Sequence, residues 1–124
     1  MPAIPQLPLS ITETSGVSVC AFPAEVDVTN AGAIRDQLLR LLDDGAGPLI
    51  LDLSATRFCD CAGVGAIMRV RRRAAERRMR LCVVLPSGGA VRRIAVMTGL
   101  TRRLPSAGSL SAAHRALGTR AVLG

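Results

Sequence analysis

Two short, nearly continuous apolar runs constrain the fold of this chain more than any other feature. The runs span residues 48–53 and 81–85 and are bounded by turn residues, which is typical of β-strands buried on both faces. Each run is followed by a segment in which apolar residues recur at helical spacing. Strands that alternate with helices in this way predict an α/β fold, in which helices cover the apolar face of a sheet.

Apolar and polar residues alternate between residues 7 and 21 around turn chemistry at 13–16, which predicts an antiparallel hairpin. The alternating apolar residues are Leu7, Leu9, Ile11, Val17, Val19 and Ala21. Because later strands are connected through helices, the antiparallel hairpin makes the predicted sheet a mixed one.

The period changes after Pro23, and Asn30 is a candidate cap for a first helix. The apolar face of this helix is expected to carry Ile34, Leu38, Leu41 and Leu42, and its water-facing side Arg35, Asp36, Arg40 and Asp43. Gly45 and Gly47 are expected to end this helix.

A loop over 54–60 leads into a second predicted helix over 61–78, and Ser87 is a candidate cap for a third that ends at Gly99. The expected inward residues of these two helices are Val64, Ile67, Met68, Ala75 and Met79, followed by Val91, Ile94, Ala95 and Thr98. A minimal strand near Leu104 and a last helix over 109–117 complete the pattern.

The 124 residues, of which 49% are hydrophobic, suit a single domain spanning 1–124 with its core at about 7–117. We expect a mixed sheet of four to five strands packed against about four helices. Only Phe22 and Phe58 are aromatic, so the core is aliphatic and little ring surface remains for stacking on bases or sugars.

No apolar run approaches the length of about 18 to 20 residues that a membrane-spanning helix needs, and residues 1–10 lack a cationic leader. We therefore expect a cytoplasmic protein without membrane insertion. The cysteines, Cys20, Cys59, Cys61 and Cys82, form no CxxC pair, and His114 is far from them, so we predict no metal site and no cofactor. Buried free thiols are the expected state of most of them.

All sixteen basic residues are arginine, and they are unevenly placed. Residues 1–60 carry eight acids and three arginines, whereas residues 61–124 carry one acid and thirteen arginines. Seven of the twelve residues 69–80 are arginine, which suggests either a footprint for nucleic acid or anionic lipid, or a solvated helix face. Without interleaved aromatics or a known nucleic-acid motif, the solvated face is favoured and nucleic acid is not an expected partner.

Four segments in register resemble the STAS domain family, in particular its anti-sigma factor antagonists. They are Ala24-Glu25-Val26-Asp27, Leu51-Asp52-Leu53-Ser54, Phe58-Cys59-Asp60-Cys61-Ala62-Gly63-Val64-Gly65, and the run from Ala90-Val91-Arg92-Arg93 to Thr98-Gly99-Leu100. The resemblance implies a regulatory domain that binds an anti-sigma factor, a serine kinase of the GHKL ATPase type, and that is not an enzyme.

In the family, the first hydroxyl residue after the loop aspartate accepts a phosphate, and that position here is Cys61. The second serine is replaced by Ala62, so ordinary serine phosphorylation of this loop is not expected. Two interpretations of Cys61 stay open. The positive end of a helix can activate a thiol as a redox switch, or cysteine is a silent replacement for serine, with Asp60 opposing thiolate formation.

The acids Asp27 and Asp60 match family residues that flank the loop, and the resemblance implies that they help the partner to recognise it. The alternative role of Asp27 is that of a turn or cap residue. The predicted partner surface is Asp27, Asn30, Asp60, Cys61, Ala62, Gly63, Val64 and Gly65. The pattern makes no prediction about oligomeric state.

The sequence supports two other function classes less well. Asp60-Cys61-Ala62-Gly63 is close to the Asp-Thr-Ala-Gly of STAS accessory subunits of lipid-transport ABC complexes, although the third helix favours the antagonists. An enzyme is disfavoured because the chain has no nucleophile paired with a base, no metal triad and no glycine-rich phosphate loop. His114 has no nearby acid or nucleophile and is expected on the surface of a helix.

Overall fold

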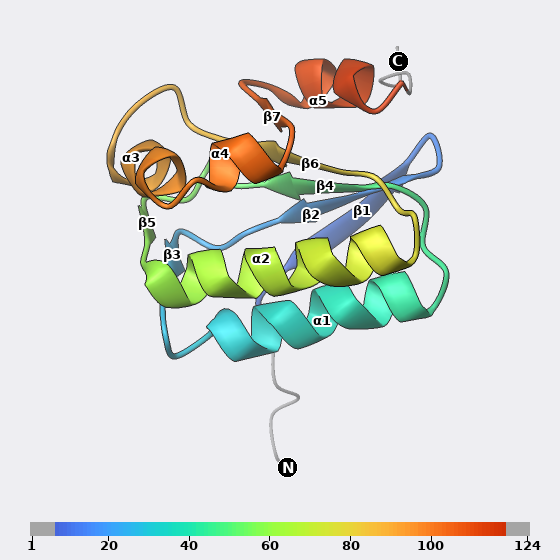
Figure 1. Cartoon of the computed structure of the whole chain (residues 1–124), viewed down its shortest axis with the longest axis horizontal. Coiled ribbons are helices and arrows are strands. Elements are labelled where there is room, and N and C mark those ends of the chain that lie inside the picture. Colours follow the sequence, from blue (N-terminus) through green and yellow to red (C-terminus); the bar gives the residue numbers. More distant parts are fainter. Residues whose placement is uncertain (1–6, 119–124) are drawn as a thin grey trace.

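The computed structural model describes residues 7–118 as a mixed sheet with helices on both faces (Figure 1). Its five strands lie in the order β1-β2-β4-β6-β7, where β1 pairs antiparallel with β2 and the other neighbours are parallel. The strands are β1 Ser10–Thr14, β2 Val17–Ala21, β4 Leu49–Asp52, β6 Leu81–Val84 and β7 Ser106–Ala107. The predicted α/β class with a mixed sheet is confirmed, and the strand expected near Leu104 lies two residues later.

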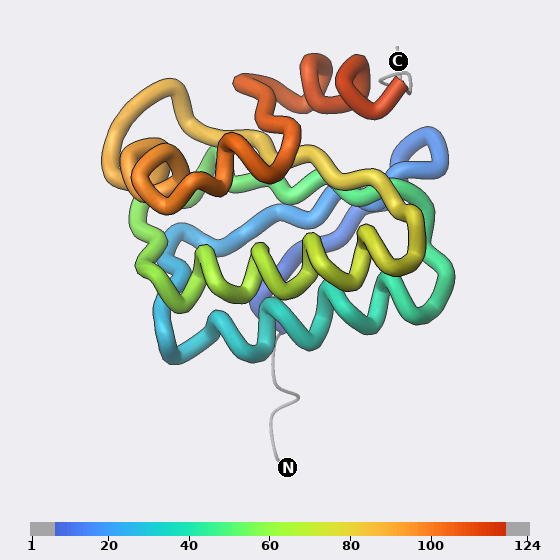
Figure 2. The backbone as a smooth tube through the Cα atoms, in the orientation of Figure 1, coloured from blue at the N-terminus to red at the C-terminus, as the bar shows by residue number. Residues whose placement is uncertain are grey.

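Five helices are described, compared with about four predicted. They are α1 Ala31–Asp43, α2 Cys61–Glu76, α3 Ala90–Met97, α4 Leu100–Arg103 and α5 Leu110–Ala116. The short α4 was missed, and Gly99 before it has a φ of 79°, the left-handed geometry predicted there. The chain path in Figure 2 runs along α1 and α2 on one side of the sheet and along α5 on the other.

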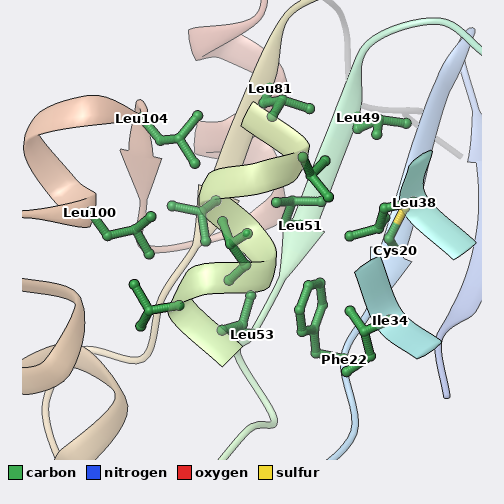
Figure 3. Packing of buried hydrophobic residues seen from close by; sticks show 14 of the residues in the cluster. Cys20, Phe22, Ile34, Leu38, Leu49, Leu51, Leu53, Leu81, Leu100 and Leu104 are labelled. Atoms are coloured by element: carbon green, nitrogen blue, oxygen red, sulfur yellow. The ribbon is translucent and has the colours of Figure 1, made fainter. Parts of the chain in front are cut away.

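Two apolar clusters sandwich the sheet because alternate residues of a strand point to opposite faces. In β4, Leu49 and Leu51 join the larger cluster under α1 and α2, whereas Ile50 joins the smaller one under α5. Figure 3 shows the larger cluster, in which Phe22 and Ile34 pack among leucines. Strands β4 and β6 are therefore buried on both faces as predicted.

The hairpin turns at Ser15 and Gly16, whose φ values of 56° and 78° give the two-residue turn that suits strand twist. The alternation of apolar residues predicted for the hairpin is only partly matched by burial, since Leu9 is buried but Leu7 and Ile11 are exposed. Leu7 precedes β1, and Ile11 lies on an edge strand that has a neighbouring strand on one side only.

Several predicted helix details were wrong. Gly89, and not Ser87, precedes α3, and Ala75 and Thr98 are exposed. In α2, Val64 and Ile67 are buried as predicted, and Val70 and Ala74 are buried as well, because the helix packs against both α1 and the sheet. His114 is also buried, since α5 turns that residue toward the sheet.

No helix within residues 7–118 is long and apolar enough to cross a bilayer. The same residues contain no cluster of three or more His, Cys, Asp and Glu side chains that could hold a metal ion.

Candidate functional site

A two-stranded sheet that the sequence did not predict holds the candidate site together. β3 (Glu25–Val26) pairs in parallel with β5 (Phe58–Cys59), and the amide of Asp60 donates to the carbonyl of Val26 at 3.1 Å. Residues 24–27 and 54–60 were expected to be turn and loop. The pairing sets the turn before α1 beside the start of α2 (Figure 1).

Asp27 organises the turn before α1. Its carboxylate accepts hydrogen bonds from the amide of Thr29 at 2.9 Å and from the Thr29 hydroxyl. The bond from the Thr29 hydroxyl is the main reason why the pKa of Asp27 lies below its usual range. Asp27 is thus an ionised turn residue at a half-exposed position, a geometry compatible with either role predicted for it.

Asn30 precedes α1 as predicted, but its side chain does not cap the helix. Its Oδ1 instead accepts from the amide of Asp27 at 3.0 Å, and its Nδ2 donates to the carbonyl of Glu25 at 2.8 Å. Since both polar atoms are used within the turn, Asn30 fixes the conformation of the segment that carries Asp27.

Asp60 is the N-cap of α2. Its side chain accepts from the amide of Gly63 at 3.1 Å, and its backbone is extended. Cys61 is the first residue of the helix, and it is the one exposed thiol among the four cysteines. The loop therefore presents Cys61 to solvent at the positive end of a sixteen-residue helix.

The remaining predicted residues divide into two groups. Ala62 and Gly65 lie on the surface, whereas Gly63 and Val64 are buried and support the fold. A Cβ on Gly63 would lie 2.6 Å from the Sγ of Cys59 and 2.7 Å from Cγ1 of Val26, so only glycine lets α2 approach β3 and β5 this closely.

A groove of about 690 Å³ between α1 and α2 continues from this surface. Small residues, among them Ala31, Gly32, Ala62 and Gly65, form much of its lining. Val28 is 77% exposed at the groove, and Arg35 and Arg69 also line it. Nothing in the sequence pattern pointed to Val28, Arg35 and Arg69 as site residues, because only the packing of α1 beside α2 brings them to this groove.

The model of the STAS domain family matches residues 8–113. The chain belongs to the STAS domain family. No curated protein matches it significantly.

Solved structures share the fold of this STAS domain. An anti-sigma factor antagonist from Mycobacterium paratuberculosis is 26% identical with a TM-score of 0.80, over 89% of this chain and 92% of that chain. The protein TM1081 from Thermotoga maritima has 19% identity and a TM-score of 0.80, over 89% and 94%. The Bacillus cell fate determinant SpoIIAA in its phosphorylated form has 22% identity and a TM-score of 0.67, over 87% and 98%.

The other three thiols of this STAS domain are buried, as expected for most of them. Burial raises the pKa of Cys20 to about 12. Burial, assisted by the nearby Asp60 carboxylate, raises the pKa of Cys59 to about 11. These groups stay protonated at neutral pH, so Cys61 is the thiol available for chemistry.

Several arginines of the 69–80 run make specific structural contacts, so the run is not simply a solvated face. Arg71 donates to the carbonyl of Arg103 at 2.8 Å, Arg73 bonds both carboxylate oxygens of Asp43, and Arg80 donates to the carbonyl of Leu117. These contacts tie α2 and the residues that follow it to α1, α4 and the end of α5.

Proposed function

We propose that this STAS domain is an anti-sigma factor antagonist that acts in the cytoplasm by binding, without catalysis of its own. Its partner is an anti-sigma factor that is a serine kinase of the GHKL ATPase type. The docking surface is formed by Asp27, Asn30, Asp60, Cys61, Ala62 and Gly65, with Gly63 and Val64 supporting it from within. The 26% identity to a mycobacterial anti-sigma factor antagonist supports this class of function.

The observation that carries the proposal is the exposure of Cys61 at the first position of α2. Amide groups at a helix start, together with the helix dipole, make this position suitable for a phosphorylated side chain. SpoIIAA, which shares the fold, has been solved both with and without phosphate. A thiol in place of a hydroxyl keeps the shape of the loop but does not accept phosphate from a serine kinase.

The consequence is a docking surface that phosphorylation does not switch off. In the phosphorylated form of a serine-bearing loop, about two negative charges would stand beside Asp60. Here no phosphate charge is added beside Asp60 and the turn of Asp27. We propose that Cys61 is a silent replacement that leaves the antagonist permanently able to bind.

The experiment combines the protein with anti-sigma factor kinases purified from the same genome and labelled ATP. Wild type should bind one kinase and remain unlabelled, whereas Cys61→Ser should become labelled if the surface presents the loop correctly. Cys61→Ala is the matched control, which should bind but stay unlabelled.

Three results would contradict the proposal. Labelling of wild type within residues 54–65 would show that another group accepts phosphate. Failure of every kinase to bind would show that the partner is not a kinase of this type. Binding to an ABC ATPase or permease instead would assign the chain to the transport-associated STAS proteins, which Asp60-Cys61-Ala62-Gly63 also resembles.

A further inference from the structure

The outward face of α3 exposes apolar side chains that the fold leaves uncovered. Val91 and Ala95 are buried beneath the helix, while Val96 is 53% exposed and Met97 81% exposed. Large apolar side chains gathered at one exposed place, with polar residues around them, are typical of protein interaction sites.

Val96 and Met97 lie together with Arg92 and Arg93 around a shallow hollow of about 340 Å³. Its remaining lining is Gly88 and Gly89, where an added Cβ would meet no atom within 4 Å. The hollow is open to a partner's side chain, because neither glycine has a side chain that would fill it.

The charges at this hollow are not neutralised within the described part of the chain. The ion pairs within residues 7–118 involve Arg35, Arg73 and Arg77 only. Arg92 donates to the carbonyl of Pro86 at 3.2 Å, which positions its guanidinium group but leaves its charge uncompensated. An apolar hollow with two uncompensated cations at its rim complements an apolar side chain flanked by carboxylates.

The α3 face also continues the surface discussed above. α3 packs against β5, and β5 carries Phe58, whose side chain is 48% exposed, and leads directly to Asp60. Figure 1 shows α3, β5 and the start of α2 at the same end of the molecule.

We propose that the outward face of α3, defined by Arg92, Arg93, Val96 and Met97, is a second docking site for an acidic amphipathic segment of a protein. An apolar side chain of that segment fills the hollow, and its carboxylates pair with the two arginines. The inference extends the proposed function, because one partner that covers both Cys61 and α3 would be held at two places on this end of the domain. A protein segment fits better than nucleic acid, because Phe58 is the only exposed aromatic side chain and only two cations lie at the hollow.

The first test uses a defined probe, a short synthetic helix with leucines along one face flanked by glutamates, titrated into ¹⁵N-labelled protein. Amide shifts should change at residues 88–97. Charge reversal by Arg92→Glu with Arg93→Glu should weaken binding at least tenfold. The matched control, Arg78→Glu with Arg115→Glu, changes the net charge equally at exposed positions outside α3 and should change binding less than twofold.

The apolar part is tested by Met97→Ser, which should weaken binding of the same helix severalfold while leaving the melting curve unchanged, since Met97 makes little contact with the core. A counterpart helix with lysine in place of glutamate should not bind.

The proposal is overturned if the acidic helix does not bind, if it binds the α3 and control variants alike, or if the amide shifts change at residues outside 88–97. Binding to vesicles of phosphatidylcholine and phosphatidylserine in place of the acidic helix would also overturn it.

A second measurement separates this inference from the proposed function. If an anti-sigma factor kinase binds wild type and the α3 variant equally well, the α3 proposal fails while the proposed function stands. If no kinase binds wild type but the acidic helix binds at α3, the proposed function fails and the α3 site remains.

Discussion

Gly63 and Gly65 near the start of α2 have very different surroundings. A Cβ at Gly63 would collide with Cys59 and Val26, whereas a Cβ at Gly65 would meet no atom within 4 Å. Gly63→Ala should therefore destabilise the fold by about 1–3 kcal/mol through overpacking. Gly65→Ala should stabilise it by about 0.5–1 kcal/mol, since alanine loses less conformational freedom in a helix. Urea unfolding of both variants measures this, and changes of the same sign would contradict it.

At the same scale, the four cysteines should differ sharply in reactivity. Cys61 is exposed, whereas burial raises the pKa of Cys20 to about 12 and that of Cys59 to about 11 and also raises the pKa of Cys82. Ellman's reagent should therefore titrate one thiol rapidly in the native protein and four after unfolding. Cys61→Ser should abolish the rapid phase. A rapid phase that persists in this variant would show that a second thiol is accessible.

Among the elements, α1 and α2 are joined at their C-terminal ends by one carboxylate. Asp43 accepts from Arg73 at 2.7 Å and lies 3.0 Å from Arg77. The hydrogen bond from Arg73 is the main cause that holds the pKa of Asp43 below 3.8. Because the folded pKa is the lower one, the stabilisation is present above pH 3.8 and is lost as the pH falls through the folded pKa.

Asp43→Asn should therefore lower the free energy of unfolding slightly at neutral pH, and the difference from wild type should vanish in acid. The effect is small because the pair is solvent-exposed. Urea titrations of both proteins across the acid range measure it. A difference that persists unchanged at the lowest pH would mean that the amide acts through packing instead of charge.

The start of α2 has a structural and a proposed binding role, and Asp60 serves both. Asp60→Ala removes the cap and should cost about 1 kcal/mol, whereas asparagine caps almost as well as aspartate. Asp60→Asn should thus keep the melting temperature while weakening kinase binding through the lost charge. Calorimetry and surface plasmon resonance of both variants separate the two roles. Unchanged binding by both variants would remove Asp60 from the docking surface.

At the scale of the whole molecule, the net positive charge is expected to give only weak binding to nucleic acid. The net charge is +7, but no aromatic residue is interleaved with the arginines of the 69–80 run, and Arg73 and Arg77 are paired with Asp43. Duplex DNA should therefore bind weakly, without sequence preference, and the affinity should fall steeply as salt is added. Fluorescence anisotropy with two unrelated duplexes measures this. Tight, sequence-selective binding at physiological salt would contradict it.

The sequence by itself determined the α/β class, the two strands β4 and β6, and most helix positions. These follow from local period: continuous apolar runs mark strands buried on both faces, and spacing of three to four residues marks one helix face. It also placed the loop from Asp60 to Gly65 at a helix start, because capping chemistry is local.

Only the tertiary structure decided which residues of that segment are exposed and what surrounds them. The pairing of β3 with β5 needs two segments more than thirty residues apart, and neither strand is long enough to show a period. The groove exists because α1 packs beside α2, which brings Val28, Arg35 and Arg69 to residues far away in the chain. Burial of His114 likewise depends on α5 covering the second face of the sheet, and no local pattern records that.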